Sequence, residues 1–348
     1  MQITSRPFGF TSDGREVHLY HMENRNGAYV DLLDWGARIQ AIGMPDKNGK
    51  IVDVCLGFDS VEGYEKYASA YMGATVGRNA NRLKDASFKL NNVVYQLSAN
   101  EGKNQLHGGT HGFDSHIWNC VMQEHLVSFY RHSAHMEEGY PGLMRVTVNF
   151  ELTSINELHI TYTAMSEEDT LVNLTNHTYF NLAGGGSIEA HTLQLQAHRI
   201  TPVDAELIPT GDILPVEGTP YDLTSPRRLG DALAEKHPLL TAARGFDINY
   251  ILDGAGYRPV AVLKNPENGI CMTCLTDMPC LQVYTGNYLE VENGKGGRAY
   301  GMHGAVCLET QRYPNAANCP SFPSVVLRAR EIFRTRTTYA FDVQKDEG

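Results

Sequence analysis

The sequence has few basic residues, no long apolar run and no dense cysteine pattern. Its 29 lysines and arginines are outnumbered by 40 aspartates and glutamates, which gives a formal net charge of -11. Nucleic acids and anionic membranes bind proteins that present a positive face, so we expect neither as a partner. No stretch reaches the roughly 20 apolar residues of a membrane span, and the N-terminus lacks the apolar core of a secretory signal. We therefore expect a soluble, cytoplasmic protein whose partner is a neutral or cationic small molecule.

The seven cysteines are scattered along the chain. Their odd number and wide spacing are unlike the disulfide frameworks of small secreted domains, so reduced thiols are the simplest prediction. Three of them lie in "CMTCLTDMPC", but no second CxxC or histidine pair follows at zinc-finger spacing. A strand would also send Cys271 and Cys274 to opposite faces. We predict no metal site in this segment.

Helical patterns are also scarce. Only "SVEGYEKYAS" and "RLGDALAEKH" look helical, and both are short. Runs of period two recur between turn signals, and "MRVTVNFELTSINELHITYTAM" predicts an antiparallel hairpin. We find no repeat, low-complexity tract or linker that would mark a domain boundary. The pattern favours one large antiparallel β-sandwich, with two tightly fused β-domains as the second possibility.

The segment "NLTNHTYFNLAGGG", residues 173 to 186, has many uncharged polar side chains. If it is a strand, alternate residues share one face. The polar face would then carry Asn173, Thr175, His177, Tyr179 and Asn181. Such a face could bind sugar hydroxyls, although an ordinary half-solvated strand is the simpler interpretation of this segment alone.

Two further segments place polar residues beside glycines. In "GATVGRNANRLKDASF", Arg82 offers a planar fork of donors to a ligand, or braces a loop by pairing with an acid. Bracing is the favoured interpretation for Arg78. In "NQLHGGTHGFDSHIW", three histidines raise the possibility of a metal site, but the Gly-Gly pair prevents the helix that their spacing would need. We favour contact between His107 and a substrate, with a hydrogen-bonded loop histidine as the alternative, and both over a metal site.

Three strand-like segments carry single functional candidates. Asp247 in "ARGFDINYIL" needs a partner or a function, because burying an unpaired carboxylate is costly. Gln282 shares a strand face with Tyr284 in "LQVYTGNYL". In "GAVCLETQRY", Glu309 shares a face with Cys307, and its small neighbours could let its pKa rise toward that of a general base. A solvated charge is the alternative for Glu309.

Taken together, these segments resemble the aldose 1-epimerase family. The matching motifs occur in that family's order and are "GATVGRNANRL", "NQLHGGTHGFD", "NHTYFNL", "TPVD", "GFDINYIL", "LQVYTGN" and "LETQRYPNAAN". The resemblance implies an all-β fold, a single large antiparallel β-supersandwich with a few short helices. It implies one domain over residues 1–348, with the sugar in an open cleft. We expect the polar face of residues 173–181 to form one wall of that cleft.

The resemblance also implies the activity, which is interconversion of the α and β anomers of free aldohexoses such as galactose and glucose. It makes Glu309 the general base that removes the C1 hydroxyl proton, and His177 the general acid that protonates the ring oxygen. The sugar-binding residues that it implies are Asn81, Arg82, His107, Asp247 and Gln282. It implies no cofactor and no metal. To act as an acid, His177 must hold its proton near neutral pH, and we expect an acidic site to raise its pKa.

Three alternatives stay open at this point. A glycoside hydrolase could use Glu309 and Asp247 as its two carboxylates. A non-catalytic sugar-binding module would need no acid and base. An epimerase for a phosphorylated hexose would need positive charge at the rim of the sugar site to bind the phosphate. Arg312 is the one basic residue beside Glu309. The preferred aldose and the oligomeric state, monomer or homodimer, do not follow from the sequence.

Overall fold

The computed structural model describes residues 2–344, and most of its regular structure is β-strand. Three large sheets have five, nine and six strands. Strands pair antiparallel throughout these sheets. The predicted all-β, antiparallel architecture is confirmed.

The elements have the following bounds, sheet by sheet and in spatial order. The five-stranded sheet contains β1 (Gln2–Phe10), β2 (Glu16–Glu23), β3 (Tyr29–Leu33), β4 (Arg38–Pro45) and β5 (Ile51–Asp53). The nine-stranded sheet contains β11 (Asn119–Gln123), β12 (Leu126–Ser133), β13 (Met144–Leu152), β14 (Glu157–Ser166), β28 (Ile332–Val343), β24 (Ile270–Thr276), β23 (Arg258–Lys264), β18 (Thr192–Leu195) and β21 (Arg227–Arg228). The six-stranded sheet contains β17 (Tyr179–Phe180), β26 (Val306–Gln311), β25 (Cys280–Tyr284), β22 (Asp247–Ile251), β19 (Arg199–Thr201) and β20 (Leu214–Pro215).

Short strand pairs and helices complete the fold. The pairs are β6 (Thr75–Val76) with β16 (Thr175–Asn176), β7 (Arg82–Leu83) with β10 (Gln105–Leu106), β8 (Ser87–Leu90) with β9 (Val93–Gln96), and β15 (Thr170–Leu171) with β27 (Val326–Leu327). The α-helices are α1 (Val61–Lys66), α2 (Leu229–Leu233) and α3 (Pro238–Ala243). The first two fall in the segments predicted as helical. The third was not predicted, because "PLLTAA" has no charged residue and none of the polar and apolar spacing found in the other two segments.

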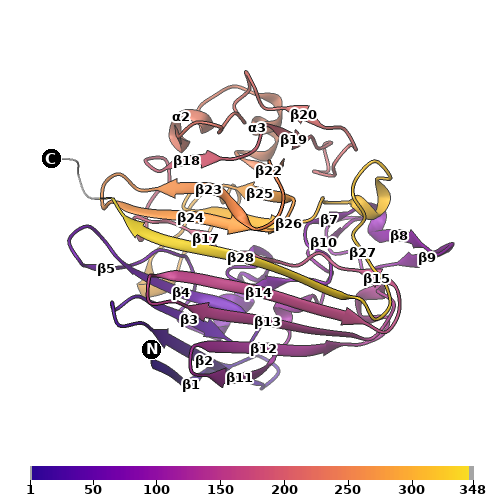
Figure 1. The fold of residues 1–348 in the computed structure, drawn as a ribbon, viewed down its shortest axis with the longest axis horizontal. Helices are drawn as coiled ribbons and strands as arrows, with labels where there is room; N and C mark the ends of the chain where they lie inside the picture. Colours follow the sequence, from indigo (N-terminus) through magenta and orange to yellow (C-terminus); the bar gives the residue numbers. More distant parts are fainter. Residues whose placement is uncertain (1, 345–348) are drawn as a thin grey trace.

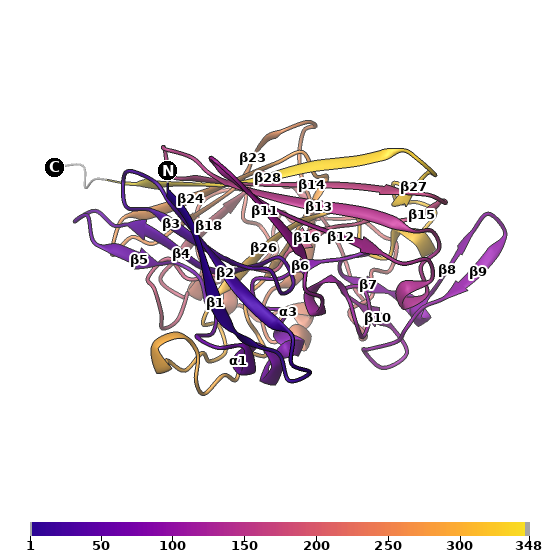
Figure 2. The same ribbon diagram turned by 90° about the horizontal axis from the view of Figure 1, so that it is seen from below.

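The nine-stranded sheet forms one layer and the other two large sheets pack on the same side of it (Figures 1 and 2). One apolar core joins the three sheets, and it includes Ile39 of β4, Phe150 of β13 and Leu308 of β26. Burial of this apolar surface is the main force that holds the layers together. The predicted hairpin lies in the nine-stranded sheet, where β13 pairs with β14 from Met144 opposite Ser166 to Leu152 opposite Leu158. Among residues 2–344, no helix has the length and apolar character needed to span a bilayer.

The polar segment that begins at Asn173 is not one regular strand. It contributes β16 to a two-stranded ladder with β6, and then β17 to the edge of the six-stranded sheet. Residues 172–182 are buried on both sides rather than on alternate ones. The prediction of a single half-exposed strand was wrong, because the polar side chains here bond to backbone groups of neighbouring loops and are buried with them.

Candidate active site

The candidate site lies on the outer face of the six-stranded sheet, away from the nine-stranded layer. Strands β22, β25 and β26 contribute Asp247, Gln282 and Glu309, and the register places Gln282 directly opposite Glu309. Side chains alternate between the faces of a strand, so Leu308 enters the core while Glu309 points outward. The sheet therefore sets the spacing of these polar groups.

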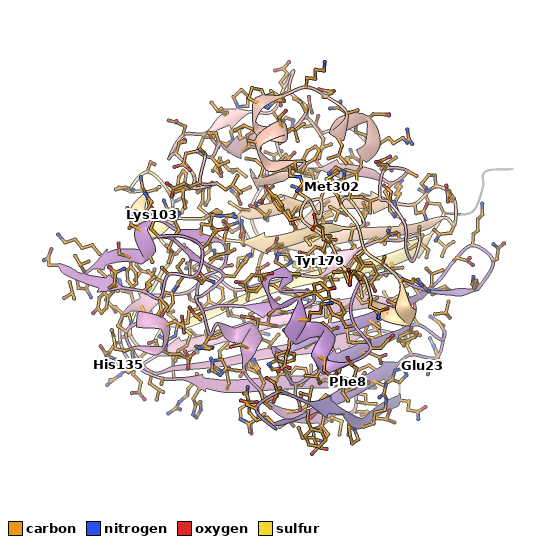
Figure 3. The ribbon with its side chains drawn as sticks, turned by 180° about the vertical axis from the view of Figure 1, so that it is seen from behind. Phe8, Glu23, Lys103, His135, Tyr179 and Met302 are labelled. Carbon is orange, nitrogen blue, oxygen red and sulfur yellow. The ribbon has the colours of Figure 1, made fainter. Side chains whose placement is uncertain are left out.

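All seven residues predicted for the site line one cleft of about 490 Å³. They are Asn81, Arg82, His107, His177, Asp247, Gln282 and Glu309. Figure 3 views the molecule from the side opposite to that of Figure 1, with Tyr179, another lining residue, near the middle. The structure thus brings together residues that are up to 228 positions apart in the sequence, 81 to 309.

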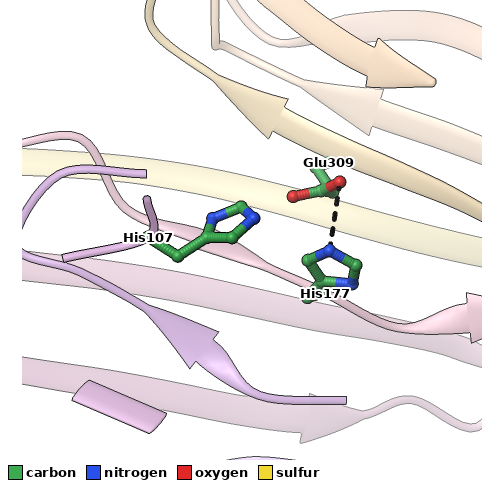
Figure 4. Close-up of side chains that lie close together, drawn as sticks. All are labelled: His107, His177 and Glu309. Atoms are coloured by element: carbon green, nitrogen blue, oxygen red, sulfur yellow. Dashed lines mark ion pairs between the residues drawn. The ribbon is translucent and has the colours of Figure 1, made fainter. Parts of the chain in front are cut away.

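His177 and Glu309 lie close together among the residues that line the cleft (Figure 4). The Nε2 atom of His177 lies 3.6 Å from Oε1 of Glu309. The His177 backbone is held on both sides, because its N–H donates to the carbonyl of Ala74 and its carbonyl accepts from Gly73 N–H. Only 5% of His177 and 2% of Glu309 are exposed, so bulk water barely screens the pair.

His107 completes this cluster from the opposite wall. The backbone N–H of Asn81 donates to its Nδ1 atom over 3.2 Å, which leaves Nε2 free toward the cleft. The His107 N–H in turn donates to the carbonyl of Asn81. One ligand-type atom from each of His107, His177 and Glu309 lies within 4.8 Å of the others, close enough for the three groups to contact one small molecule.

The glycine after His107 is required by the local backbone. Gly108 has φ of +94°, and a Cβ atom there would lie 1.9 Å from the carbonyl oxygen of Gly77. Gly108→Ala is therefore expected to lower the free energy of unfolding by about 1 to 3 kcal/mol more than an alanine at an uncrowded positive-φ glycine, because the Cβ must displace the Gly77 carbonyl, and to reduce kcat/KM by moving His107. Thermal melting and steady-state kinetics measure the two effects. Gly102→Ala is the matched control, since Gly102 also has positive φ but has no atoms near the added Cβ. Equal losses in both variants would contradict the steric explanation.

Arg82 is oriented by two acids. Its Nε and Nη2 atoms donate to the two carboxylate oxygens of Glu101 over 2.7 and 2.8 Å, and its Nη1 atom lies 4.0 Å from Asp247. Asp247 also accepts a 2.6 Å hydrogen bond from Gln282. Arg82 therefore pairs with an acid as one interpretation held, and it also lines the cleft, so its contact with a ligand stays a prediction. Glu101 was missed, since the polar loop that carries it has no distinguishing pattern.

Burial has opposite effects on the two central groups. Desolvation raises the pKa of Glu309 well above its ordinary value, Asp247 adds to this increase, and Arg82 opposes it. Desolvation lowers the pKa of His177 to about 4. The expectation that acidic surroundings would raise the pKa of His177 was wrong, because loss of water from the buried ring is the larger effect. Burial thus favours the uncharged form of both groups, a carboxylic acid beside a neutral imidazole.

Only part of the polar segment 173–181 reaches the cleft. His177 and Tyr179 line it, but the three asparagines hold loops in place. Asn176 donates to the carbonyl of Gly73, and Asn181 to the carbonyls of Gly186 and Gly304. Asn173 likewise accepts from the backbone N–H of Arg312. The prediction that this polar face forms a wall of the site holds for two side chains and is wrong for the asparagines.

Other sequence candidates have structural roles. Arg78 is buried and donates to Ser133 Oγ and to backbone carbonyls, so it braces loops as expected, although through carbonyls rather than an acid. The Nε2 atom of His116 contacts the carbonyl of His111, and neither ring lines the cleft. The three histidines of that segment do not converge.

Several tyrosines in the cleft were missed or left without a role. Tyr71 has φ of +50°, and its ring centroid lies 4.7 Å from that of His107. Tyr284 and Tyr288 close another part of the cleft. Aromatic faces pack well against apolar C–H groups of a ligand, so the cleft combines stacking surfaces with hydrogen-bonding groups. Tyrosines are common in cores, so their type alone could not reveal this position.

Comparison with known proteins agrees with this geometry. The family model described as Aldose 1-epimerase matches residues 18–340. Galactose mutarotase from Bos taurus is 42% identical over 318 residues, which cover 90% of this chain and 91% of the relative. Galactose mutarotase from Homo sapiens is 39% identical over 346 residues, covering 98% and 99%. The crystal structure of an aldose epimerase homologue from C. elegans superposes with a TM-score of 0.88 at 30% identity, covering 94% of this chain and 99% of that one.

Proposed function

The chain belongs to the aldose 1-epimerase family, and we propose that Glu309 and His177 give it its mutarotase activity on free aldoses. The enzyme is an isomerase that interconverts α and β anomers of hexoses such as galactose and glucose. The observation that carries the assignment of residues is the 3.6 Å approach of His177 Nε2 to Glu309 Oε1 inside an open cleft. An acid and a base at this spacing can reach the two oxygens attached to C1 of one pyranose.

The reaction needs one exchangeable proton on the pair. Glu309 as carboxylate takes the C1 hydroxyl proton while the His177 imidazolium protonates the ring oxygen, and the hemiacetal opens. The pair is then a carboxylic acid and a neutral imidazole. After the aldehyde rotates, the two groups return the protons in reverse and the ring closes on the other face.

The resting pair matches the open-chain stage of this cycle. Without a sugar, burial favours the proton on Glu309 and a neutral ring at His177. Before a cyclic sugar can open, the proton must therefore move from Glu309 to His177. The sugar favours this transfer, because its ring oxygen accepts a hydrogen bond from protonated Nε2 and its C1 hydroxyl donates one to the Glu309 carboxylate. No metal or cofactor takes part in these steps.

The remaining predicted residues bind and orient the sugar. Asn81, Arg82, His107, Asp247 and Gln282 offer donors and acceptors around the cleft. Three carboxyl groups and one guanidinium line it, namely Glu101, Asp247, Glu309 and Arg82. This negative excess disfavours a phosphorylated hexose. Arg312 does not compensate, because its guanidinium lies over the ring of Phe333 and outside the lining.

Polarimetry on freshly dissolved α-D-galactose tests the activity. The rate of equilibration should rise in proportion to the protein concentration. Rates measured with glucose, xylose and arabinose will show which aldose is preferred. Glucose 6-phosphate should react more slowly than glucose. Aryl glycosides serve as the control, since release of nitrophenol would indicate the glycoside hydrolase alternative. Calorimetric sugar binding without acceleration would indicate a non-catalytic module.

The pH dependence follows from the single shared proton. Below about pH 4 both groups are protonated and no base remains, because that is the pKa of His177. At high pH Glu309 loses its proton and no acid remains, and this limb lies well above the ordinary carboxyl range because its pKa is raised. We expect a bell-shaped profile of kcat/KM with a broad maximum around neutral pH, after subtraction of the uncatalysed rate. A rate that falls steadily from pH 7 to pH 5 would contradict this arrangement.

Removal of metal ions should not affect the rate. The proposed chemistry uses only side-chain acids and bases, so exhaustive dialysis against EDTA is expected to leave kcat/KM unchanged within error. The same polarimetric assay measures it, with a parallel sample dialysed without chelator. A loss that added Zn²⁺ reverses would contradict metal-independent catalysis. Location in the cytoplasm, the single domain over residues 1–348 and the monomer or homodimer state stay predictions.

A further inference from the structure

We infer that Cys307 is a positioning residue that holds the imidazole of His177 with Nε2 toward Glu309; the inference rests on the proposed function. The Sγ atom of Cys307 lies 3.6 Å from Nδ1 of His177, and both side chains are buried. The sequence placed Cys307 on the strand face of Glu309 without giving it a role.

A single strand contacts both nitrogens of the ring. Cys307 and Glu309 are successive same-face positions of β26, about 6.6 to 6.8 Å apart along a strand. The ring of His177 bridges them, with Nδ1 at the sulfur and Nε2 3.6 Å from the carboxyl oxygen. Cys307 is itself fixed between two neighbouring strands, opposite Tyr179 of β17 and Tyr284 of β25. Rotation of the imidazole would lose both contacts.

The contact also selects the tautomer. When Glu309 carries the shared proton, Nε2 must be bare to receive it. The neutral ring then carries its hydrogen on Nδ1 and donates it to Sγ, which is a weak acceptor. Neutral imidazole has only these two tautomers, so fixing the hydrogen at Nδ1 determines which nitrogen reacts.

A thiol suits this position because it orients the ring without trapping the proton there. Burial and the nearby Glu309 carboxyl raise the pKa of the Cys307 thiol well above its ordinary value, so it stays uncharged. A carboxylate in its place would favour the imidazolium and hold the proton on His177. The proton must instead pass in both directions during one turnover.

Two substitutions separate orientation from packing. Cys307→Ala removes the acceptor, and Cys307→Ser keeps one of similar size. In galactose equilibration we expect Cys307→Ala to lower kcat about three- to tenfold, the effect of one neutral hydrogen bond, with KM within about twofold. Cys307→Ser should stay within about twofold of wild type. Cys274→Ala is the matched control, because Cys274 is equally buried but lies on β24 in the other layer.

Nitrogen-15 NMR of the imidazole measures which ring nitrogen carries the hydrogen, and a purely packing role of Cys307 would not change this. At neutral pH the wild-type His177 should show a protonated Nδ1 and a bare Nε2, and Cys307→Ala should show a mixture of both tautomers. A wild-type ring protonated at Nε2, or a Cys307→Ala variant with unchanged kcat, would overturn the inference. Absence of any anomer equilibration by the wild-type protein would instead overturn the proposed function.

Discussion

Glu309→Gln is expected to slow the enzymatic equilibration of α-D-galactose anomers by about 10²- to 10⁴-fold, the usual effect of removing one general acid or base. Glutamine has nearly the same shape and can still donate and accept hydrogen bonds, but it cannot take the C1 hydroxyl proton. Because the sugar contacts are kept, KM should change much less than kcat. Polarimetry over a range of galactose concentrations separates the two constants.

The same substitution should leave the fold intact or make it more stable. Glu309 is buried with an unpartnered Oε2 atom and a raised pKa, so above the pKa of an unfolded glutamate folding must bind a proton or bury a charge, and either one opposes folding. At pH 7 a neutral amide removes this penalty, and thermal melting should show no decrease. Glu151→Gln, at an exposed position of β13, is the control for the substitution itself. Near-normal turnover in Glu309→Gln would remove this residue from the mechanism.

His177→Asn is expected to cause a loss of similar size, about 10²- to 10⁴-fold in kcat. Asparagine fits the space and offers an amide donor, but it cannot carry a proton between the ring oxygen and Glu309. The acid limb of the pH profile should disappear along with the rate, because that limb is the protonation of this imidazole. Stopped polarimetric traces at pH 4 to 8 measure both effects.

His111→Asn is the control for this variant. His111 is exposed, lies four positions after His107 in the chain, and is not among the residues that line the cleft. It should keep the wild-type rate and pH profile. If His177→Asn instead retains most of its activity and the same acid limb, another group supplies the proton to the ring oxygen.

The sequence predicted the fold class and the position of the sheet residues well. Period two correctly separated Gln282 from Leu281 and Val283, and Glu309 from Val306 and Leu308, because alternation is a property of the extended backbone itself. That β22, β25 and β26 are neighbours, with Asp247, Gln282 and Glu309 in one cleft, came only from the structure. The helices α1 and α2 also fall where they were predicted. Strand pairing across the long sheet could be predicted only for local hairpins, since partners such as β14 and β28 are distant in the chain.

The parts of the site that the sequence did not reveal depend on tertiary contacts. Glu101 matters only because the fold brings it to Arg82. The direction of the His177 pKa shift was mistaken, since burial outweighs nearby charge and burial is not visible in the sequence. Asn176 and Asn181 resemble ligand-binding residues by type, but their partners are loop carbonyls that become neighbours only in the folded chain.

The central claim is that Glu309 and His177 act as one proton-transferring unit, and the double variant tests it most directly. Groups that act together show strongly non-additive losses, because removing either one already disables the shared step. We predict that kcat of Glu309→Gln/His177→Asn for galactose anomer equilibration equals that of the slower single variant within about threefold. If the two residues act independently, the fold-losses of kcat in the two single variants will multiply in the double variant. That result would contradict the account.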